Sequence, residues 1–384
     1  MEITDIDVFP LEVPESGPPG ENARATAQFT GSPCLIVRIH TDEDLVGLGE
    51  TSMTMPGNDS FIETIAWVLE KQVKPRLIGE DPRNREKLLR MVADLSKLDG
   101  EFTYEKAAID IALHDILAKQ AGIPLYTLLG GRVRENIPVS RSIGRMAPDE
   151  AADRAEELVE IGYRLLTVKA GFGAEADIER VAAVREAVGP SVPIEVDPNG
   201  AYGTKEAIQT LGVMEREYGV IACEQPNIEW DLDGLARINR AVDMTIAADE
   251  PIRQAHDVPA IGCKGAADQI TLKLFKQGGL HDSLKIIDTA AAFGMTCNSG
   301  SLHPTGVGTS AIRHLCVSRP NVTELGWGYP TAPDRFEFDV IREELTMEDG
   351  YVEPPEGPGL GVTLDEDRLH ECLLDIDYRS IPAG

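Results

Sequence analysis

Five charged residues recur at nearly even intervals along the middle of the chain, each directly after a short apolar run. They are Lys169, Asp197, Glu224, Asp249 and Lys273, separated by 28, 27, 25 and 24 residues. A buried strand with its crossover helix and loops takes about 30 residues, so each gap accommodates one strand–helix unit. Because parallel strands present their carboxyl ends at one edge, we expect the five charges to face a common point.

The alternation of short apolar runs with amphipathic stretches extends from about residue 136 to about residue 330. Eight buried parallel strands with intervening helices over roughly 190 residues are typical of a (β/α) barrel. A doubly wound sheet is the alternative, but an open sheet would spread five consecutive strand ends apart. The predicted strands are 137–142, 165–169, 193–197, 220–224, 245–248, 269–273, 295–298 and 322–325.

The sequence on either side of this alternation is organised differently. Runs rich in β-branched residues and then helical stretches precede it, which favours an α+β domain. We therefore predict an α+β domain at 1–130, the barrel at 131–330 and a C-terminal segment at 331–384 that returns to the first domain. The early strands are predicted at 3–13, 34–39 and 45–50, and the helices at about 59–77, 83–95 and 103–121.

Composition excludes several classes of protein. No apolar stretch reaches the roughly 18 residues of a membrane span. The N-terminus lacks the plan of a signal peptide and the six cysteines form no CxxC pair, so we expect a cytoplasmic protein with reduced cysteines and no zinc site. The net charge of −29 argues against nucleic acid and anionic membranes as partners. It fits either an acidic, hydrated surface or a high-salt cytoplasm.

Three of the five recurring residues are acids, each at or just after the end of a predicted strand. Asp197, Glu224 and Asp249 would form an all-oxygen site, which favours Mg²⁺ or Mn²⁺ over zinc. Lys169 and Lys273 would lie on opposite sides of the barrel mouth. A base beside a divalent cation suits removal of the proton α to a carboxylate, because the metal stabilises the ene-diolate that results. The second lysine could return a proton on the other face.

Ordered motifs along nearly the whole chain resemble those of one family, the mandelate racemase/muconate lactonizing enzyme family of the enolase superfamily. Within it, the chain is most similar to the muconate lactonizing enzyme subgroup. The motifs are residues 47–51, 106–115, 128–131, 163–171, 196–200, 223–226, 247–251, 268–273, 278–279 and 357–361.

This resemblance implies a modified (β/α)7β TIM-type barrel under an α+β capping domain built from both termini. It implies Mg²⁺, with Mn²⁺ as a substitute, on Asp197, Glu224 and Asp249, and acid/base roles for Lys169 and Lys273. A small-molecule carboxylate would be the substrate, and we expect the chain to form a homo-oligomer.

The resemblance also implies the surroundings of the reacting groups. Glu250 would lie just behind the metal, and Asn199 would lie near the metal or the substrate carboxylate. Cap loops at about 16–32 and 51–60 would close the site. Ser299 and His303 follow the seventh predicted strand and are candidate substrate contacts. His303 is not expected to be a base, because Lys273 stands where a His–Asp dyad would need an aspartate.

Two departures from the subgroup pattern bear on the substrate. Thr167 replaces the first lysine of a Lys-x-Lys motif, which removes a cationic neighbour of Lys169. The Asp-x-Asp pattern of dipeptide epimerases is absent at 325–329, which argues against dipeptides. Trp327 in that segment could offer its ring to a cationic or N-alkylated substrate, or it could be a core or interface tryptophan.

Three classes of function remain open at this point. The first is an Mg²⁺-dependent racemase or epimerase of an amino acid derivative or related carboxylate. Thr167 and Trp327 favour this class slightly over the second. The second is muconate-type cycloisomerisation or dehydration of a hydroxy acid through the same ene-diolate. The third, a non-catalytic ligand-binding barrel, is disfavoured by the complete set of acids and lysines.

Overall fold

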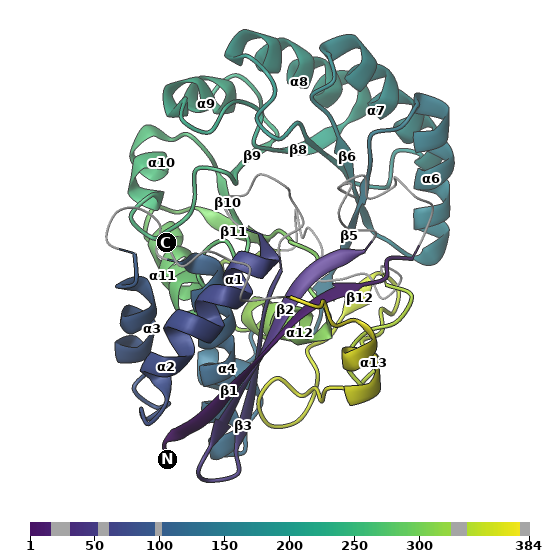
Figure 1. The fold of residues 1–384 in the computed structure, drawn as a ribbon. Coiled ribbons are helices and arrows are strands. Elements are labelled where there is room, and N and C mark those ends of the chain that lie inside the picture. Colours follow the sequence, from purple (N-terminus) through teal and green to yellow (C-terminus); the bar gives the residue numbers. More distant parts are fainter. Residues whose placement is uncertain (17–30, 53–60, 97–101, 324–335, 377–384) are drawn as a thin grey trace.

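The computed structural model describes residues 1–16, 31–52, 61–96, 102–323 and 336–376. An antiparallel sheet with its helices occupies one side of the molecule, and a curled parallel sheet surrounded by helices occupies the other (Figure 1). This arrangement confirms the predicted fold class, a TIM-type barrel with an α+β cap. None of the helices in these ranges combines the length and apolarity needed to cross a bilayer.

The parallel sheet has seven strands in the described residues, in the order β11-β10-β9-β8-β7-β6-β5. Neighbours in space are also neighbours in sequence, which is the strand order of a (β/α) barrel and differs from that of a doubly wound sheet. The strands are β5 (Ser140–Ile143), β6 (Leu165–Lys169), β7 (Ile194–Asp197), β8 (Val220–Glu224), β9 (Thr245–Ala248), β10 (Gln269–Leu272) and β11 (Thr296–Ser299). The helices are α6 (Pro148–Ile161), α7 (Ala174–Val188), α8 (Thr204–Tyr218), α9 (Leu232–Asn239), α10 (Val258–Lys264), α11 (Leu280–Ala292) and α12 (Gly306–Val317).

The first predicted barrel strand differs from the structure, and the last lies partly outside the described residues. The run 137–142 is divided into β4 (Ile137–Pro138) and β5, because β4 pairs with β12 (Tyr351–Val352) and the Val139 amide donates to the Gly350 carbonyl at 2.9 Å. These hydrogen bonds turn the start of the run toward the C-terminal segment. In the described part of the predicted strand 322–325, Val322 forms an isolated parallel bridge with Cys297, and residues 324–325 lie outside the described ranges.

The cap contains strands β1 to β3, in that order, with helices on one face. The strands predicted at 34–39 and 45–50 correspond to β2 and β3, which pair antiparallel as a hairpin. The strands are β1 (Ile3–Val13), β2 (Ser32–Thr41) and β3 (Val46–Ser52). The helices are α1 (Ile62–Val68), α2 (Lys74–Leu77), α3 (Arg85–Ala93), α4 (Thr103–Ala121) and α5 (Leu125–Leu129).

The helical stretch predicted at 59–77 contains an irregularity that the sequence reading missed. A π-helical turn, η1 (Leu69–Val73), lies between α1 and α2, and the Lys74 amide donates to the Leu69 carbonyl. Pro75 has no N–H and its ring crowds the carbonyl four residues earlier, which a wider turn relieves. Helix α4, in contrast, has the predicted bounds and ends at Gly122, whose φ of 68° suits glycine.

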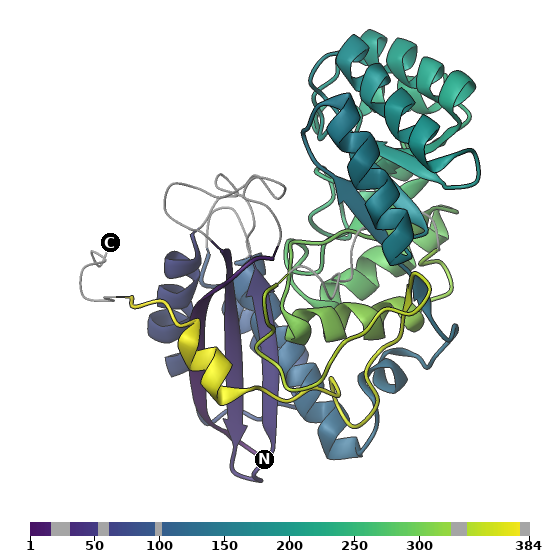
Figure 2. The ribbon, with the colours of Figure 1, turned by 90° about the vertical axis from the view of Figure 1, so that its right-hand side faces the viewer.

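The C-terminal segment crosses back to the cap. Helix α13 (Glu366–Glu371) lies against the antiparallel sheet (Figure 2), where Glu366 pairs with Arg38 at 2.5 Å. Leu373 then forms an antiparallel bridge with Leu11 of β1. The division of the chain at residues 130 and 330 remains a prediction.

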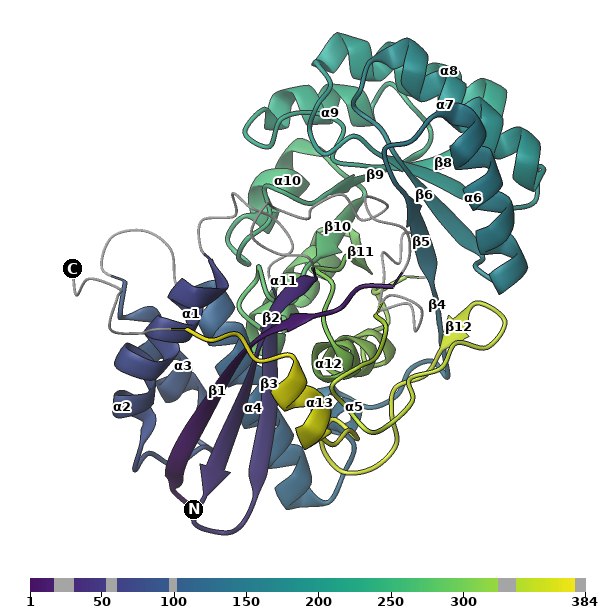
Figure 3. The same cartoon turned by 45° about the vertical axis from the view of Figure 1, so that its right-hand side comes forward.

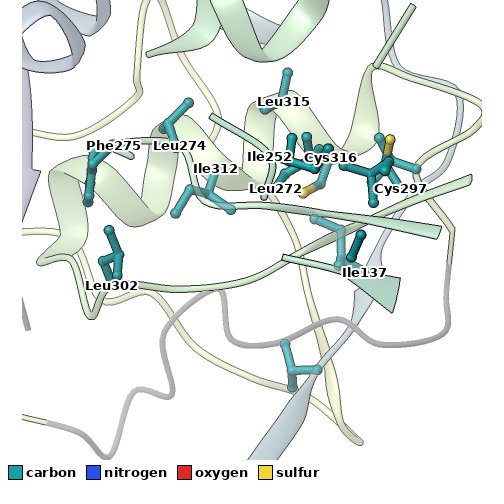
Figure 4. Packing of buried hydrophobic residues seen from close by; sticks show 14 of the residues in the cluster. Ile137, Ile252, Leu272, Leu274, Phe275, Cys297, Leu302, Ile312, Leu315 and Cys316 are labelled. Atoms are coloured by element: carbon teal, nitrogen blue, oxygen red, sulfur yellow. The ribbon is translucent and has the colours of Figure 1, made fainter. Parts of the chain in front are cut away.

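Cap and barrel share a hydrophobic core. One cluster of buried residues includes Leu11 and Cys34 of the cap sheet together with Leu272 of the barrel and Leu315 of α12. Figure 4 shows part of this cluster, where side chains of the β10–β11 region pack against α12. The two halves of the molecule therefore form one packed body, which fixes the cap over the barrel.

Two glycines of β3 allow this strand to lie directly on α4. A methyl group at Gly49 would lie 1.8 Å from the Ala108 carbonyl oxygen, and one at Gly47 would lie 2.3 Å from that of Ala112. Both obstacles are helix backbone, which cannot move aside as a flexible side chain would. Only glycine at these positions gives the observed strand–helix distance.

We expect Gly49→Ala to destabilise the protein by about 3 kcal/mol or more, at the upper end for overpacking a core. Chemical denaturation of both proteins measures the change. Gly203→Ala is the matched control, because a methyl group there meets no atom within 4 Å, and it should change stability by about 1 kcal/mol or less. Unfolding of Gly49→Ala at the wild-type denaturant concentration would contradict this account of the close packing.

Candidate active site

The five recurring charges lie at the carboxyl ends of five consecutive strands, β6 to β10, which run side by side in Figure 3. Lys169, Asp197 and Glu224 are the last residues of β6, β7 and β8, and Asp249 and Lys273 directly follow β9 and β10. Lys169 and Asp197 are register partners across β6 and β7. The short parallel strands thus deliver all five side chains to one end of the barrel.

Lys169 lies beside the first acid of the row. Its Nζ donates to Asp197 Oδ2 and, at 3.2 Å, to Asn199 Oδ1. The Asn199 amide in turn donates to Asp197 Oδ1 at 2.8 Å, and Asn199 has a φ of 48°. Asp197 is almost fully buried, with 2% of its side chain exposed, whereas Lys169 keeps 23% exposed. The ammonium group is therefore held at the edge of the site by a carboxylate and an amide oxygen.

Lys273 occupies the opposite end of the row. Its Nζ donates to Asp249 Oδ2 and lies 3.7 Å from Glu224 Oε1. Burial alone would lower the pKa of Lys273, but the charges of Asp249, Glu224 and Glu250 outweigh it and raise this pKa. The raised pKa favours the ammonium form of Lys273, which is the form that can deliver a proton.

A third lysine, which the sequence reading missed, also contacts Asp249. Lys276 Nζ donates to Asp249 Oδ1 and to its carbonyl oxygen, both at 2.7 Å. Burial opposes ionisation of Asp249, yet Lys273 and Lys276 together hold its pKa below the usual range. Lys276 follows Lys273 by three residues in the turn after β10, where Gln277 Oε1 accepts a hydrogen bond from the Lys273 amide at 3.1 Å.

Of the three acids, Glu224 is the one whose negative charge nearby lysines offset least. Burial and then the negative charge of Asp197 raise its pKa well above the usual value, and Lys273 offsets this only in part. Asp197 and Asp249 are buried and Glu224 is largely covered. Repulsion among three such adjacent carboxylates is what a divalent cation relieves, and an all-oxygen donor set suits Mg²⁺. The residues therefore fit such an ion in type and in placement on adjacent strands.

The carboxylates do not form a closed metal cage as they stand. Within the described ranges, no group of three or more His, Cys, Asp or Glu side chains converges as metal ligands would. The lysine ammonium groups instead contact the oxygens of Asp197 and Asp249. A cation at this position would share these carboxylates with the two lysines.

Thr167 and Glu195 form a buried pair below Lys169 and Asp197. The Thr167 hydroxyl donates to Glu195 Oε1, and both side chains are about 4% exposed. Burial raises the pKa of Glu195 to about 7. The threonine that replaces the first motif lysine thus has an acid as its partner, and Glu195 was missed although strand periodicity puts it on the same face as Asp197.

Glu250 directly follows Asp249, and its Oε1 accepts a hydrogen bond from Asn199 Nδ2 at 3.4 Å, which links the two candidate residues. Burial and the charge of Asp249 raise the pKa of Glu250 to about 7. Its Oε2 atom is buried and accepts no hydrogen bond from the described residues. Glu250 therefore has an acceptor oxygen to offer.

The candidates after β11 are placed differently from one another. The Ser299 hydroxyl is buried and bonds its neighbour's carbonyl at 3.3 Å and the Cys316 thiol, so it turns toward α12. Asn298, which pairs with Thr271 in the sheet, is on the other face, and its Oδ1 is buried without a partner among the described residues. His303 is half-buried with a φ of 59°. Trp327 lies outside the described residues.

Comparison with known protein families matches both parts of the chain. Residues 5–130 match the family model for the mandelate racemase / muconate lactonizing enzyme, N-terminal domain. Residues 150–368 match the model described as enolase C-terminal domain-like.

Three relatives match most of the chain. An N-succinyl-L-Arg/Lys racemase of Bacillus cereus is 31% identical over 97% of this chain and 98% of its own length. Its crystal structure superimposes with a TM-score of 0.89, covering 98% of this chain and 99% of that one at 30% identity. Muconate cycloisomerase 1 of Rhodococcus opacus is 31% identical over 96% and 98% of the two chains. A hydrophobic dipeptide epimerase of Enterococcus faecalis is 37% identical over 85% and 91%.

Proposed function

Because the chain belongs to the mandelate racemase/muconate lactonizing enzyme family of the enolase superfamily, an isomerase family in the relatives above, we propose that it is an Mg²⁺-dependent racemase or epimerase of an amino acid derivative. The reaction would remove the proton α to the substrate carboxylate and return it on the opposite face. Asp197, Glu224 and Asp249 would hold the metal.

The observation that carries this proposal is the position of two lysines at the two ends of the row of acids. Lys169 ends β6 and Lys273 follows β10, with three strands and all three acids between them. A carboxylate substrate bound at the acids would have one lysine on either side. Inversion at a carbon needs a base on one face and an acid on the other, which this placement supplies.

Each lysine has a carboxylate partner that fixes the direction of its side chain. Asp197 and Asn199 direct Lys169, and Asp249 directs Lys273. A neutral lysine would take the α-proton, and the other, as an ammonium ion, would deliver one. When bound, a divalent cation supplies positive charge to the ene-diolate oxygens and offsets the acids, which favours a neutral lysine.

A muconate-type cycloisomerase is the second candidate, and the similarity to muconate cycloisomerase 1 favours it. That reaction needs a lysine acting on one face only. The racemase and dipeptide epimerase relatives, together with the two-sided placement of lysines, put isomerisation of an amino acid derivative first. Dehydration of a hydroxy acid requires the same residues and belongs in the same screen.

A substrate screen in D₂O tests the proposal directly. N-acylated amino acids, dipeptides, betaines, hydroxy acids and muconates would each be incubated with the Mg²⁺-loaded enzyme and followed by ¹H NMR and polarimetry. We expect deuterium at the α-carbon with loss of optical rotation for at least one amino acid derivative. Turnover of a muconate without α-exchange of any amino acid derivative would instead establish the cycloisomerase.

A further inference from the structure

Glu50, at the end of β3 in the cap, is a buried carboxylate that the proposed chemistry does not use. It is fully inaccessible to solvent. Its Oε1 accepts from the Thr305 amide at 2.7 Å. Its Oε2 accepts from the Thr305 hydroxyl at 2.7 Å and from the Gly308 amide at 2.6 Å. Three donors from one short segment of the barrel therefore converge on this one cap side chain.

These bonds connect the cap to the segment between β11 and α12. Thr305 immediately precedes α12, and Gly308 lies in its first turn. Two residues after Glu50, the Ser52 hydroxyl donates to the Leu302 carbonyl at 2.6 Å. The last residues of β3 thus hold the 300–308 loop through Leu302 near its start and through Thr305 and Gly308 near its end.

The same loop forms a wall beside Lys273. The Gly300 amide donates to the Leu272 carbonyl at 2.7 Å, and a methyl group at Gly300 would lie 3.0 Å from Lys273 Cε. A methyl group at Gly308 would lie 2.6 Å from Cζ of Phe275, two residues beyond Lys273. A displacement of this loop would therefore reach the lysine side chain directly.

The burial of Glu50 is costly for stability alone. Burial raises its pKa to about 7, even though the Thr305 and Gly308 hydrogen bonds favour the ionised form. Replacing a buried carboxylate and its donors with apolar groups of similar shape often leaves a protein equally or more stable. Directed hydrogen bonds, however, fix a loop in one position, which non-directional apolar contacts do not.

We propose that Glu50 is a positioning residue, which holds residues 300–308 against Lys273 in the arrangement needed for proton transfer. This rests on the proposed function of Lys273 as an acid or base. A shift of about 1 Å in a reacting group can lower a rate by about 100-fold, so a hydrogen-bonded clamp far from the substrate can matter.

Glu50→Gln is the decisive variant because it keeps shape and polarity but cannot satisfy the same donors. Whichever way the amide is turned, its NH₂ group faces the backbone N–H of Thr305 or of Gly308. We expect hydrogen exchange of amides 300–308 to accelerate by about tenfold. We expect kcat for α-proton exchange to fall by about 10- to 100-fold, with KM changed less than about threefold.

Two further variants complete the design. Glu43→Gln, in the exposed turn between β2 and β3, is the matched control and should leave both readouts unchanged. Ser52→Ala removes only the bond to Leu302, and we expect smaller changes in the same direction as for Glu50→Gln. If Glu50→Gln does not fold, Ser52→Ala decides the matter.

A folded Glu50→Gln enzyme with wild-type kcat would overturn the inference, whether or not its loop exchanges faster, because Glu50 would then serve stability only. If the proposed function is wrong, the wild-type enzyme itself will exchange no α-proton, and this result distinguishes that case from a wrong role for Glu50. In that case unchanged exchange of amides 300–308 in Glu50→Gln would still refute the clamp.

Discussion

Replacing Lys169 or Lys273 with alanine should lower the rate of inversion at the α-carbon by about 10²- to 10⁴-fold, the range a general acid or base contributes. Each replacement removes the proton carrier on one face of the substrate. The remaining lysine should still exchange the α-proton of the enantiomer that faces it, without inverting the centre. ¹H NMR in D₂O, run separately with each enantiomer, measures both rates.

The loss should reflect chemistry and not collapse of the site. After Lys273→Ala, Asp249 keeps its bonds to Lys276, and after Lys169→Ala, Asp197 keeps its bond to the Asn199 amide. Lys264→Ala is the matched control, because that side chain is 41% exposed and pairs with Asp233 on the surface. Full exchange and inversion in both alanine variants would show that the lysines are wrongly assigned.

The two lysine variants also discriminate between the candidate reactions. In a racemase, either replacement abolishes inversion. Each variant still exchanges the α-proton of one enantiomer, and this enantiomer differs between the two variants. A cycloisomerase acts on one face, so one variant should lose turnover while the other keeps much of it. This asymmetry can be measured even before the natural substrate is known, with any carboxylate that exchanges.

The barrel and the row of charges could be predicted because both depend on local sequence. In strand–helix units of similar length, the carboxyl ends of the strands lie at one end of the sheet. The five charges from Lys169 to Lys273 could therefore be placed from the sequence. The break at Val139 could not be predicted in this way. It depends on hydrogen bonds to Gly350, about 210 residues further along the chain.

The contacts among the residues of the site were less predictable than the identity of those residues. Whether Lys273 pairs with Asp249 or stands free depends on burial and on distances of a few ångströms, which spacing does not encode. Lys276 and Glu195 were missed because each seemed ordinary alone, as a surface-type lysine or a strand acid. Only the fold brings Lys276 to Asp249 and Glu195 to Thr167. Glu50 was seen only as part of a motif, since its partners at 305 and 308 come from another part of the chain.

Removing divalent metal should abolish α-proton exchange, and adding Mg²⁺ should restore it. Without the metal, the ene-diolate has only lysine ammonium groups to balance its charge, and they are the groups that must also carry the proton. We expect loss of activity on treatment with a chelator, with Mn²⁺ able to replace Mg²⁺. Full activity in protein shown by elemental analysis to contain no divalent metal would refute the mechanism.

Glu224→Gln tests the metal site without an activity assay. Because burial and Asp197 raise the pKa of Glu224, its ionised form destabilises the folded metal-free protein at neutral pH, and a neutral amide should relieve this. The metal-free variant should therefore melt above metal-free wild type. With Mg²⁺ at about 100 times its Kd, wild type should gain about 2.7 kcal/mol, and the variant much less. Asp233→Asn, on the surface, is the control for charge alone. Equal stabilisation of wild type and Glu224→Gln by Mg²⁺ would mean that the ion binds elsewhere, since a ligand carboxylate cannot be neutralised without weakening the site.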